Sequence, residues 1–257
     1  MNSRVITLTG IRNARDLGGL CGADGRRIRT GCLLRSAHLG EAADSDEALL
    51  KQTWRLRTVI DLRTGREVQK QPDRQMSGVE QLHMPVFDEQ RIGISHEQKQ
   101  DALSRLPQLD LLYRDMMKEE SCQKSFGAIL RRIMTHDYEQ GSVLWHCTEG
   151  KDRCGMVSAL VLLALGADEE TVREDYLLTN ETNGPKAEGY YRKMLADGHD
   201  PAQAEAVRNL FLAREDYLDA ALSVINACNP LTYLEEDLGI PREIIMNFRE
   251  KMLEDKE

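Results

Sequence analysis

The chain has 257 residues, of which 41% are hydrophobic, 30% are charged and 5% are aromatic. This composition is typical of a globular protein and excludes a collagen-like, low-complexity or wholly disordered chain. With 34 basic and 43 acidic residues the net charge is −9, which argues against a general nucleic-acid-binding protein, so we expect no nucleic-acid partner. An anionic ligand must therefore be bound by a local group of donors that works against the charge of the whole molecule.

Targeting signals and cysteine spacing limit the class of protein further. The longest apolar run, residues 157–165 with Ser158 inside it, is too short to cross a bilayer, so we expect no stable membrane insertion. Residues 1–9 carry one arginine and no signal-peptide cleavage pattern, which predicts a cytoplasmic protein. The six cysteines include no Cys-x-x-Cys pair, so the sequence indicates neither a zinc site nor a disulfide framework.

In chain order, short strand-like segments come first. They are residues 5–8, 58–62, 80–86 and 142–146. A helix is predicted to begin at Asp44 or Ser45 and to run to about Arg55. The stretch 96–135 is polar and amphipathic, and it is long enough for two or three helices.

Helical patterns dominate after the last strand. Apolar residues recur at helical spacing in 157–165, Gly166 ends that helix, and Asp168 caps the next one. Asp200–Pro201 opens another helix, whose single apolar face is predicted to extend through residues 204–225. Early strands and late helices together predict an α/β fold with a helical C-terminal portion.

Residues 141–155 carry the chemistry. They read Gly-Ser-Val-Leu-Trp-His-Cys-Thr-Glu-Gly-Lys-Asp-Arg-Cys-Gly, a pattern that predicts a buried strand, a tight loop and a helix N-terminus. Backbone N–H groups in such a loop lack helical partners and, together with the helix dipole, form a site for phosphate or another oxyanion. The predicted binding residues are Thr148, Glu149, Gly150, Lys151, Asp152 and Arg153.

Two side chains of this loop are the predicted catalytic pair. Cys147 begins the loop, and the surrounding donors and positive charge favour its thiolate, which is placed to attack phosphorus in line. Arg153 closes the loop, and its planar fork can hold two phosphoryl oxygens at once. Because backbone donors and Arg153 supply the positive charge, we expect no metal and no cofactor.

At these residues the sequence resembles a known family. His146-Cys147-x5-Arg153 is similar to the phosphate-binding signature of cysteine-dependent protein tyrosine phosphatases, and the longer HCxxGKDR form resembles their bacterial tyrosine/serine or lipid-active branch. Matches to that branch also occur at residues 13–19 (Asn-Ala-Arg-Asp-Leu-Gly-Gly), 24–26, 34–36, 60–63 and 175–180. The resemblance implies a protein-tyrosine-phosphatase-like central sheet flanked by helices. It also implies a single phosphatase domain over residues 1–257, with a helical insertion at about 90–120 that is either a lid over the pocket or an ordinary packed helix pair.

The resemblance leaves two aspartates as candidates for the general acid. Many tyrosine phosphatases place this residue on a mobile loop upstream of the nucleophile, where Asp88 follows Met84-Pro85-Val86-Phe87. In the HCxxGKDR branch the role belongs to the aspartate beside the arginine, which is Asp152 here. We favour Asp152 because the motif fixes its place in the loop.

Cys154 departs from the family pattern, which has threonine or serine after the arginine. A thiol is a weaker donor than a hydroxyl, so breakdown of the intermediate is expected to be slower. Two interpretations remain: Cys154 replaces the hydroxyl residue without further effect, or it traps oxidised Cys147 as a disulfide.

The leading hypothesis is a cysteine-dependent phosphatase for phosphate monoesters, chiefly phosphotyrosine on proteins, that acts through a phosphocysteine intermediate. The charge of Lys151 resembles that of phosphatases for multiply phosphorylated head groups, so a dual-specificity or phosphoinositide phosphatase is the alternative. The further alternatives are a pseudophosphatase that binds phosphorylated ligands without turnover, and a sulfur-transfer protein of the rhodanese type.

Overall fold

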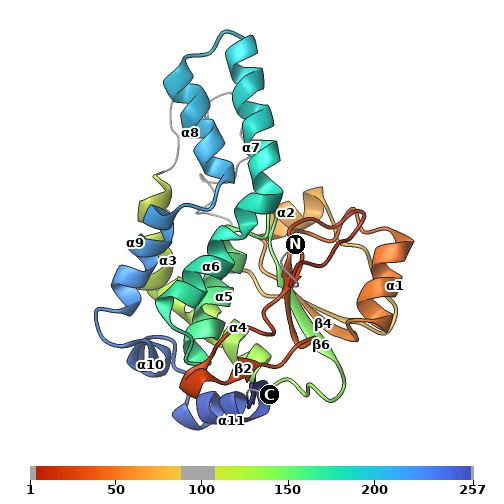
Figure 1. The fold of residues 1–257 in the computed structure, drawn as a ribbon, viewed down its shortest axis with the longest axis vertical. Helices are drawn as coiled ribbons and strands as arrows, with labels where there is room; N and C mark the ends of the chain where they lie inside the picture. The colour runs from red at the N-terminus through yellow and green to blue at the C-terminus, as the bar shows by residue number, and fades with distance from the viewer. Residues whose placement is uncertain (1–3, 88–107, 256–257) are drawn as a thin grey trace.

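A computed structural model describes residues 4–87 and 108–255. A five-stranded sheet lies at the centre (Figure 1) and has the order β1-β3-β6-β4-β5. Its strands are β1 (Arg15–Asp16), β3 (Leu33–Ser36), β4 (Leu56–Asp61), β5 (Glu80–His83) and β6 (Ser142–His146). All neighbours are parallel except β1, which is antiparallel to β3. The carboxyl ends of β3, β4, β5 and β6 therefore meet at one edge of the sheet.

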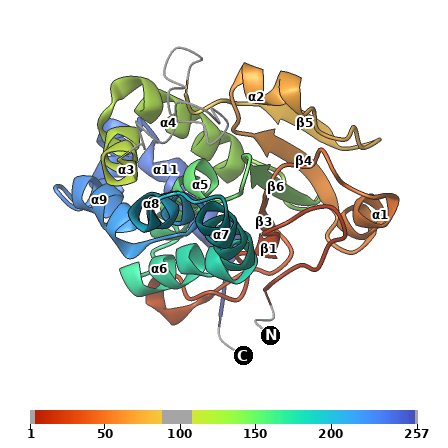
Figure 2. The same ribbon diagram turned by 90° about the horizontal axis from the view of Figure 1, so that it is seen from above.

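Helices cover both faces of this sheet. They are α1 (Asp44–Gln52), α2 (Gly65–Lys70), α3 (Leu109–Lys118), α4 (Glu120–Met134), α5 (Asp152–Ala164), α6 (Glu169–Leu177), α7 (Thr179–Ala196), α8 (Pro201–Phe211), α9 (Glu215–Ile225), α10 (Pro230–Thr232) and α11 (Arg242–Met252). Figure 2 shows α1 on one side of the sheet and most other helices on the opposite side. The predicted α/β fold with a phosphatase-like central sheet and a helical C-terminal portion is confirmed.

Side-chain alternation along the strands divides the core in two. Val143 and Trp145 of β6 belong to the larger cluster with α4 and α5, whereas Leu144 belongs to a smaller cluster with Leu50 of α1. Successive side chains of a strand point to opposite faces, so a strand covered on both sides is apolar throughout. This explains why all of β6 is buried.

Helix α5 is the central helix of the larger layer. Every residue from Cys154 to Ala164 is buried, because the sheet packs on one side of the helix and other helices on the other. As predicted, Gly166 follows the helix with a φ of 77°. The Asp168 carboxylate caps α6 by accepting a hydrogen bond from Thr171 N. Because α5 begins directly after the loop that follows β6, its N-terminus lies at the carboxyl edge of the sheet.

Two sequence predictions about secondary structure are wrong. The single helix expected from Pro201 onward is two helices, because residues 212–214 are extended between α8 and α9. Asn180 holds this break by exchanging two hydrogen bonds, each 2.8 Å long, with the backbone of Ala213. The expected strand at 5–8 is only a bridge from Val5 to Arg15 of β1. Strand β3, at residues 33–36, was not predicted.

The insertion predicted at about 90–120 is described only in part, since residues 88–107 lie outside the described residues. Its later section is α3, which packs against α9 and buries Leu109, Tyr113, Met116 and Met117.

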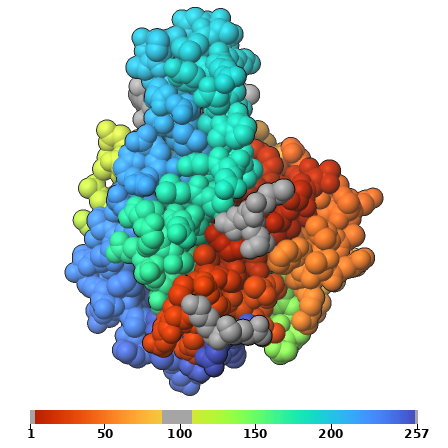
Figure 3. All heavy atoms as spheres, in the orientation of Figure 1, coloured from red at the N-terminus to blue at the C-terminus, as the bar shows by residue number. Residues whose placement is uncertain are grey.

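A second, two-stranded sheet joins the two ends of the chain, because β2 (Arg27–Ile28) pairs with β7 (Leu253–Glu254). Helices α7 and α8 form a hairpin that projects from the body (Figures 1 and 3). Within the described ranges, no helix has both the length and the apolar character needed to cross a membrane.

Candidate active site

The predicted oxyanion loop lies at the carboxyl edge of the sheet, between β6 and α5. Cys147 follows directly after β6 and is 1% exposed. The loop turns at Gly150, which has a φ of 67°. A Cβ atom at Gly150 would lie 2.6 Å from the backbone carbon and oxygen of Ser36 in β3. Only glycine therefore allows the loop to pack this closely on the sheet.

Two side chains hold the loop from behind. Asn13 Nδ2 donates to the carbonyl oxygens of Glu149 and Gly150 at 3.1 and 3.0 Å, and Arg35 Nη2 donates to the Gly150 oxygen at 2.8 Å. In a trans peptide the N–H and C=O groups point in opposite directions. Carbonyls that face these donors therefore leave the N–H groups of Gly150 and Lys151 directed away from them, as an oxyanion site requires.

Asp175 of α6 links the supporting side chains. Its carboxylate contacts Arg15 Nε at 3.0 Å, Arg35 Nη1 at 2.6 Å and Arg4 Nη1 at 2.8 Å. Arg15 in turn donates to Asn13 Oδ1 at 2.5 Å. Burial alone would raise the pKa of Asp175, but the charges of Arg15, Arg35 and Arg4 hold it well below its usual range. The N-terminal motif and the 175–180 motif thus meet beneath the loop.

Arg153 is oriented by a residue that the sequence analysis missed. Its two Nη atoms contact the two carboxylate oxygens of Glu67 on α2 at 2.5 and 2.7 Å, and Thr148 Oγ1 donates to the same carboxylate at 2.5 Å. Burial would raise the pKa of Glu67, but the hydrogen bonds and charge of Arg153 bring it well below its usual range. The available signal was Thr64-x-x-Glu67, a capping box that marks the start of α2 but not its partner across the site.

Asp152 is the first residue of α5 and lies beside the loop. Its Oδ1 atom accepts a hydrogen bond from Tyr113 OH at 2.6 Å and lies 3.0 Å from Lys151 Nζ. The Lys151 side chain is fully buried, and its ammonium group donates to the carbonyl oxygens of Leu210 and Leu212 at 2.8 and 3.2 Å. Lys151 therefore joins the loop to the segment between α8 and α9. The other candidate acid, Asp88, lies outside the described residues.

The remaining loop residue, Glu149, is held by basic side chains. Its Oε1 atom accepts a hydrogen bond from Lys186 of α7 at 2.6 Å, and Arg12 lies 3.5 Å from Oε2. The base of the projecting hairpin is thus attached to the loop.

The Cys154 thiol points toward β6. It is fully buried and its Sγ donates to the Trp145 carbonyl oxygen at 3.6 Å. Burial raises the pKa of this thiol to about 11, so it stays protonated at neutral pH. A disulfide with Cys147 would remove the proton that Cys154 donates in this contact, and the redox switch stays a prediction.

Behind Cys147, His146 belongs to a buried ionic network. Its Nε2 atom lies 3.0 Å from Asp73 Oδ2, and its Nδ1 atom lies 3.3 Å from the Cys147 carbonyl oxygen. Asp61, Asp73 and His146 are close enough together to hold a metal ion. However, Arg63 Nη2 already contacts Asp61 at 2.8 Å and Asp73 at 2.9 Å, and a cation in this position accounts for the two carboxylates.

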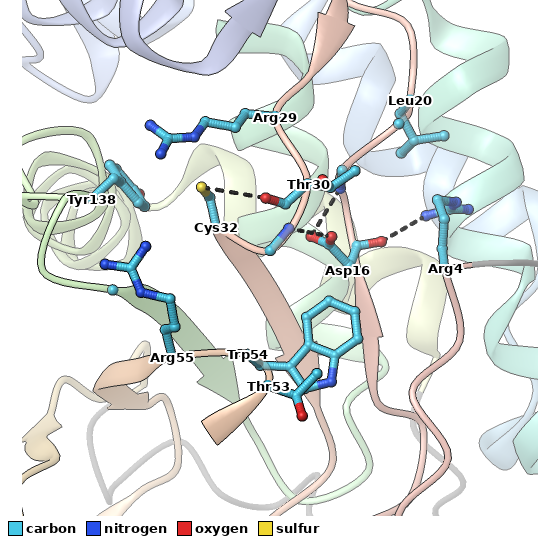
Figure 4. A pocket seen from close by; sticks show the side chains of 14 residues that line it. Arg4, Asp16, Leu20, Arg29, Thr30, Cys32, Thr53, Trp54, Arg55 and Tyr138 are labelled. Carbon is cyan, nitrogen blue, oxygen red and sulfur yellow. Dashed lines mark hydrogen bonds between the residues drawn. The ribbon is translucent and has the colours of Figure 1, made fainter. Parts of the chain in front are cut away.

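A separate cavity of about 730 Å³ opens where β3, β4 and β6 begin, at the edge of the sheet opposite the loop (Figure 4). Two of its three arginines are engaged with Glu139, since Arg29 contacts the carboxylate at 3.1 Å and Arg55 donates to the carbonyl oxygen at 2.6 Å. The third, Arg4, contacts Asp175. Burial raises the pKa of the Cys32 thiol in its wall to about 11. This cavity therefore offers no thiolate, and the loop at residues 147–153 is the candidate active site.

A buried thiol, a glycine turn and an oriented guanidinium lie together at the N-terminus of a helix, as the cysteine-dependent phosphatase signature predicts. The sequence matches the tyrosine phosphatase family over residues 6–254, and the chain belongs to that family.

Relatives of the chain are also named as phosphatases. A protein of Cupriavidus necator classed as a tyrosine-protein phosphatase is 33% identical over 84% of this chain and 77% of its own length. The triple specificity protein phosphatase PtpB of Mycobacterium tuberculosis is 29% identical over 96% of this chain and 98% of its own length. Among solved structures, TpbA of P. aeruginosa matches 81% of this chain and 98% of its own, with 14% identity and a TM-score of 0.30.

Proposed function

We propose that this cysteine-dependent phosphatase hydrolyses phosphotyrosine on proteins, and that it does so through a phosphocysteine intermediate. The observation that carries the proposal is the loop itself. It combines the Cys147 thiol, backbone N–H groups turned toward the oxyanion site and an Arg153 fork that Glu67 has already oriented.

The reaction has two steps. In the first, the Cys147 thiolate attacks phosphorus, so that a P–S bond forms while the bond to the leaving oxygen breaks. The loop N–H groups and Arg153 bind the equatorial oxygens, and Asp152 donates its proton to the leaving oxygen. In the second, water attacks the phosphocysteine, Asp152 takes a proton from that water, and the thiolate leaves with the electron pair of the P–S bond.

A broader substrate range is the second candidate function. The name of the Mycobacterium tuberculosis relative states a triple specificity, which favours a substrate range beyond phosphotyrosine. The ammonium group of Lys151 is bound to two backbone carbonyls, which argues against its use for a second phosphate of a phosphoinositide. A pseudophosphatase is disfavoured because Cys147 and Arg153 are both present.

The test is turnover of phosphotyrosine, phosphoserine and phosphoinositide substrates, with Cys147→Ser as the inactive control. We expect release of phosphate from a phosphotyrosine peptide by the wild type, and none by Cys147→Ser, which should still bind the peptide. A wild type that binds the peptide without turnover would support the pseudophosphatase instead. Sulfur transfer from thiosulfate would support the rhodanese alternative.

A further inference from the structure

Tyr113 is a buried phenol that contacts the candidate acid. It lies on α3, is 0% exposed and donates from its hydroxyl to Asp152 Oδ1 at 2.6 Å. Tyr176 of α6, also buried, donates to the Tyr113 oxygen at 2.8 Å. Because a carboxylate can only accept, the direction of both bonds is set, from Tyr176 to Tyr113 to Asp152.

Packing holds the Tyr113 ring in this orientation. The Tyr176 ring meets it edge to face at a centroid distance of 6.1 Å, and the Tyr217 ring of α9 lies 5.7 Å from it. Burial, followed by the charge of Asp152, raises the pKa of Tyr113 well above its usual value. The phenol therefore remains a donor throughout the neutral range.

Other groups also act on Asp152 from the elements packed around it. Lys151 lies 3.0 Å from Oδ1, and Arg153, Tyr176 and Tyr217 interact with the carboxylate electrostatically. Both cations, Lys151 and Arg153, remain present when a neighbouring tyrosine is replaced by phenylalanine. Of the phenols, Tyr113 is the one with a hydrogen bond to Asp152 among the described residues.

We infer that Tyr113, held in place by Tyr176, is a positioning residue that fixes the Asp152 carboxyl group and lowers its affinity for a proton. Because Oδ1 faces both the Tyr113 hydroxyl and the Lys151 ammonium group, we assign the acid proton to Oδ2. This carboxyl geometry prepares Asp152 to protonate the leaving oxygen. The inference rests on the proposed function, because it requires Asp152 to be the general acid.

Removal of the Tyr113 hydroxyl should change both pH dependence and leaving-group dependence. Without this donor the Asp152 carboxyl group should keep its proton to higher pH. The basic limb of kcat, where the rate falls, should therefore move up by about one pH unit, as expected for the loss of one hydrogen bond to a charged group. Because the carboxyl group is held less firmly, kcat should also fall about tenfold on phenyl phosphate, which has a poor leaving group. The fall should be much smaller on p-nitrophenyl phosphate, which has a good one.

The experiment compares the pH profiles of kcat on both substrates for the wild type, Tyr113→Phe, Tyr176→Phe and Tyr138→Phe. Tyr138→Phe is the matched control, because Tyr138 is also buried and donates to the Ile133 carbonyl oxygen at 2.9 Å, at the opposite edge of the sheet. We expect the full change for Tyr113→Phe, a smaller one in the same direction for Tyr176→Phe, and none for Tyr138→Phe.

Thermal unfolding of each variant shows whether it is folded. If Tyr113→Phe does not fold, Tyr176→Phe still tests the pair of hydrogen bonds from Tyr176 to Tyr113 to Asp152. The inference is overturned if the basic limb of kcat does not move in the folded Tyr113→Phe and Tyr176→Phe variants, or if Tyr138→Phe changes it equally. In either case, turnover by the wild type would still support the proposed function. If the wild type hydrolyses neither substrate, or Cys147→Ser retains activity, the proposed function and the inference both fail.

Discussion

Glu67 engages both terminal nitrogens of Arg153, so the guanidinium group is oriented before a phosphate arrives. Its fork carries further N–H donors for the phosphoryl oxygens. The same carboxylate accepts from Thr148 Oγ1 and so ties the beginning of the loop to its end. Glu67 thus orients the Arg153 charge and fixes the shape of the proposed oxyanion site.

Replacement of Glu67 should therefore impair catalysis without removing any group of the reaction. We expect Glu67→Gln to lower kcat/KM about tenfold or more, because an amide cannot accept two charge-assisted bonds from Arg153. The measurement is steady-state hydrolysis of p-nitrophenyl phosphate. Glu47→Gln is the control: Glu47 also pairs with an arginine, Arg74, but it lies on α1, away from the loop. Equal kinetics for the two variants would contradict this role of Glu67.

At the scale of elements, the turn between β6 and α5 depends on Gly150. Gly150→Ala adds a methyl group 2.6 Å from the Ser36 backbone at a φ of 67°, so the loop must move away from β3. We expect a loss of about 1–3 kcal/mol in the free energy of unfolding, together with much weaker binding of inorganic phosphate. Chemical denaturation and phosphate inhibition measure the two effects.

The control for this prediction is Gly189→Ala in α7. A Cβ atom there meets no other atom within 4 Å, and alanine has a higher helix propensity than glycine. Gly189→Ala should therefore keep or slightly raise stability and leave phosphate binding unchanged. If Gly150→Ala behaves in the same way, close packing on Ser36 is not what requires the glycine.

Secondary structure near the site could be predicted where a single local signal decides it. The strand–loop–helix unit around Cys147, the Asp168 cap and the Asp200–Pro201 helix start all follow from neighbouring residues. The extended break after Phe211 could not be predicted, because Asn180 and Lys151 hold it through contacts with distant segments. Strand β3 was missed because half of it, Arg35 and Ser36, is polar yet buried.

The residues that complete the site were missed for a related reason. Glu67 and Tyr113 come from segments about 80 and 40 residues before the loop, and their local patterns indicate only a helix cap and an apolar helix face. Their contacts with Arg153 and Asp152 exist only once α2 and α3 are placed around α5. A motif search along the chain cannot supply such pairs.

For the whole molecule, buried and half-buried carboxylates make the free energy of unfolding depend on pH in the acidic range. The pKa values of Glu67 and Asp175 lie well below their usual range in the folded state. Burial would raise the pKa of Asp73, but the nearby His146 ring and the charge of Arg63 lower it to about 2. These carboxyl groups bind protons near pH 4 in the unfolded chain and only at lower pH in the folded one.

The unfolded state therefore takes up more protons as the pH falls from about 4.5 to 2, and the free energy of unfolding should fall across this window. Urea denaturation at a series of pH values measures the slope. Asp73→Asn should start less stable near neutral pH and lose less stability on acidification than the wild type. An equal slope in both proteins would show that Asp73 is not perturbed in this way.

The strand order also has a consequence for the timing of synthesis. β6 lies between β3 and β4 in the sheet, yet it is the last of the five strands to leave the ribosome. Until about residue 146 has emerged, β3 and β4 each have an edge without its partner strand, and such edges invite pairing with other chains. A nascent chain stalled before β6 would therefore expose both of these edges, and the strand that closes the sheet is the one that Cys147 follows directly.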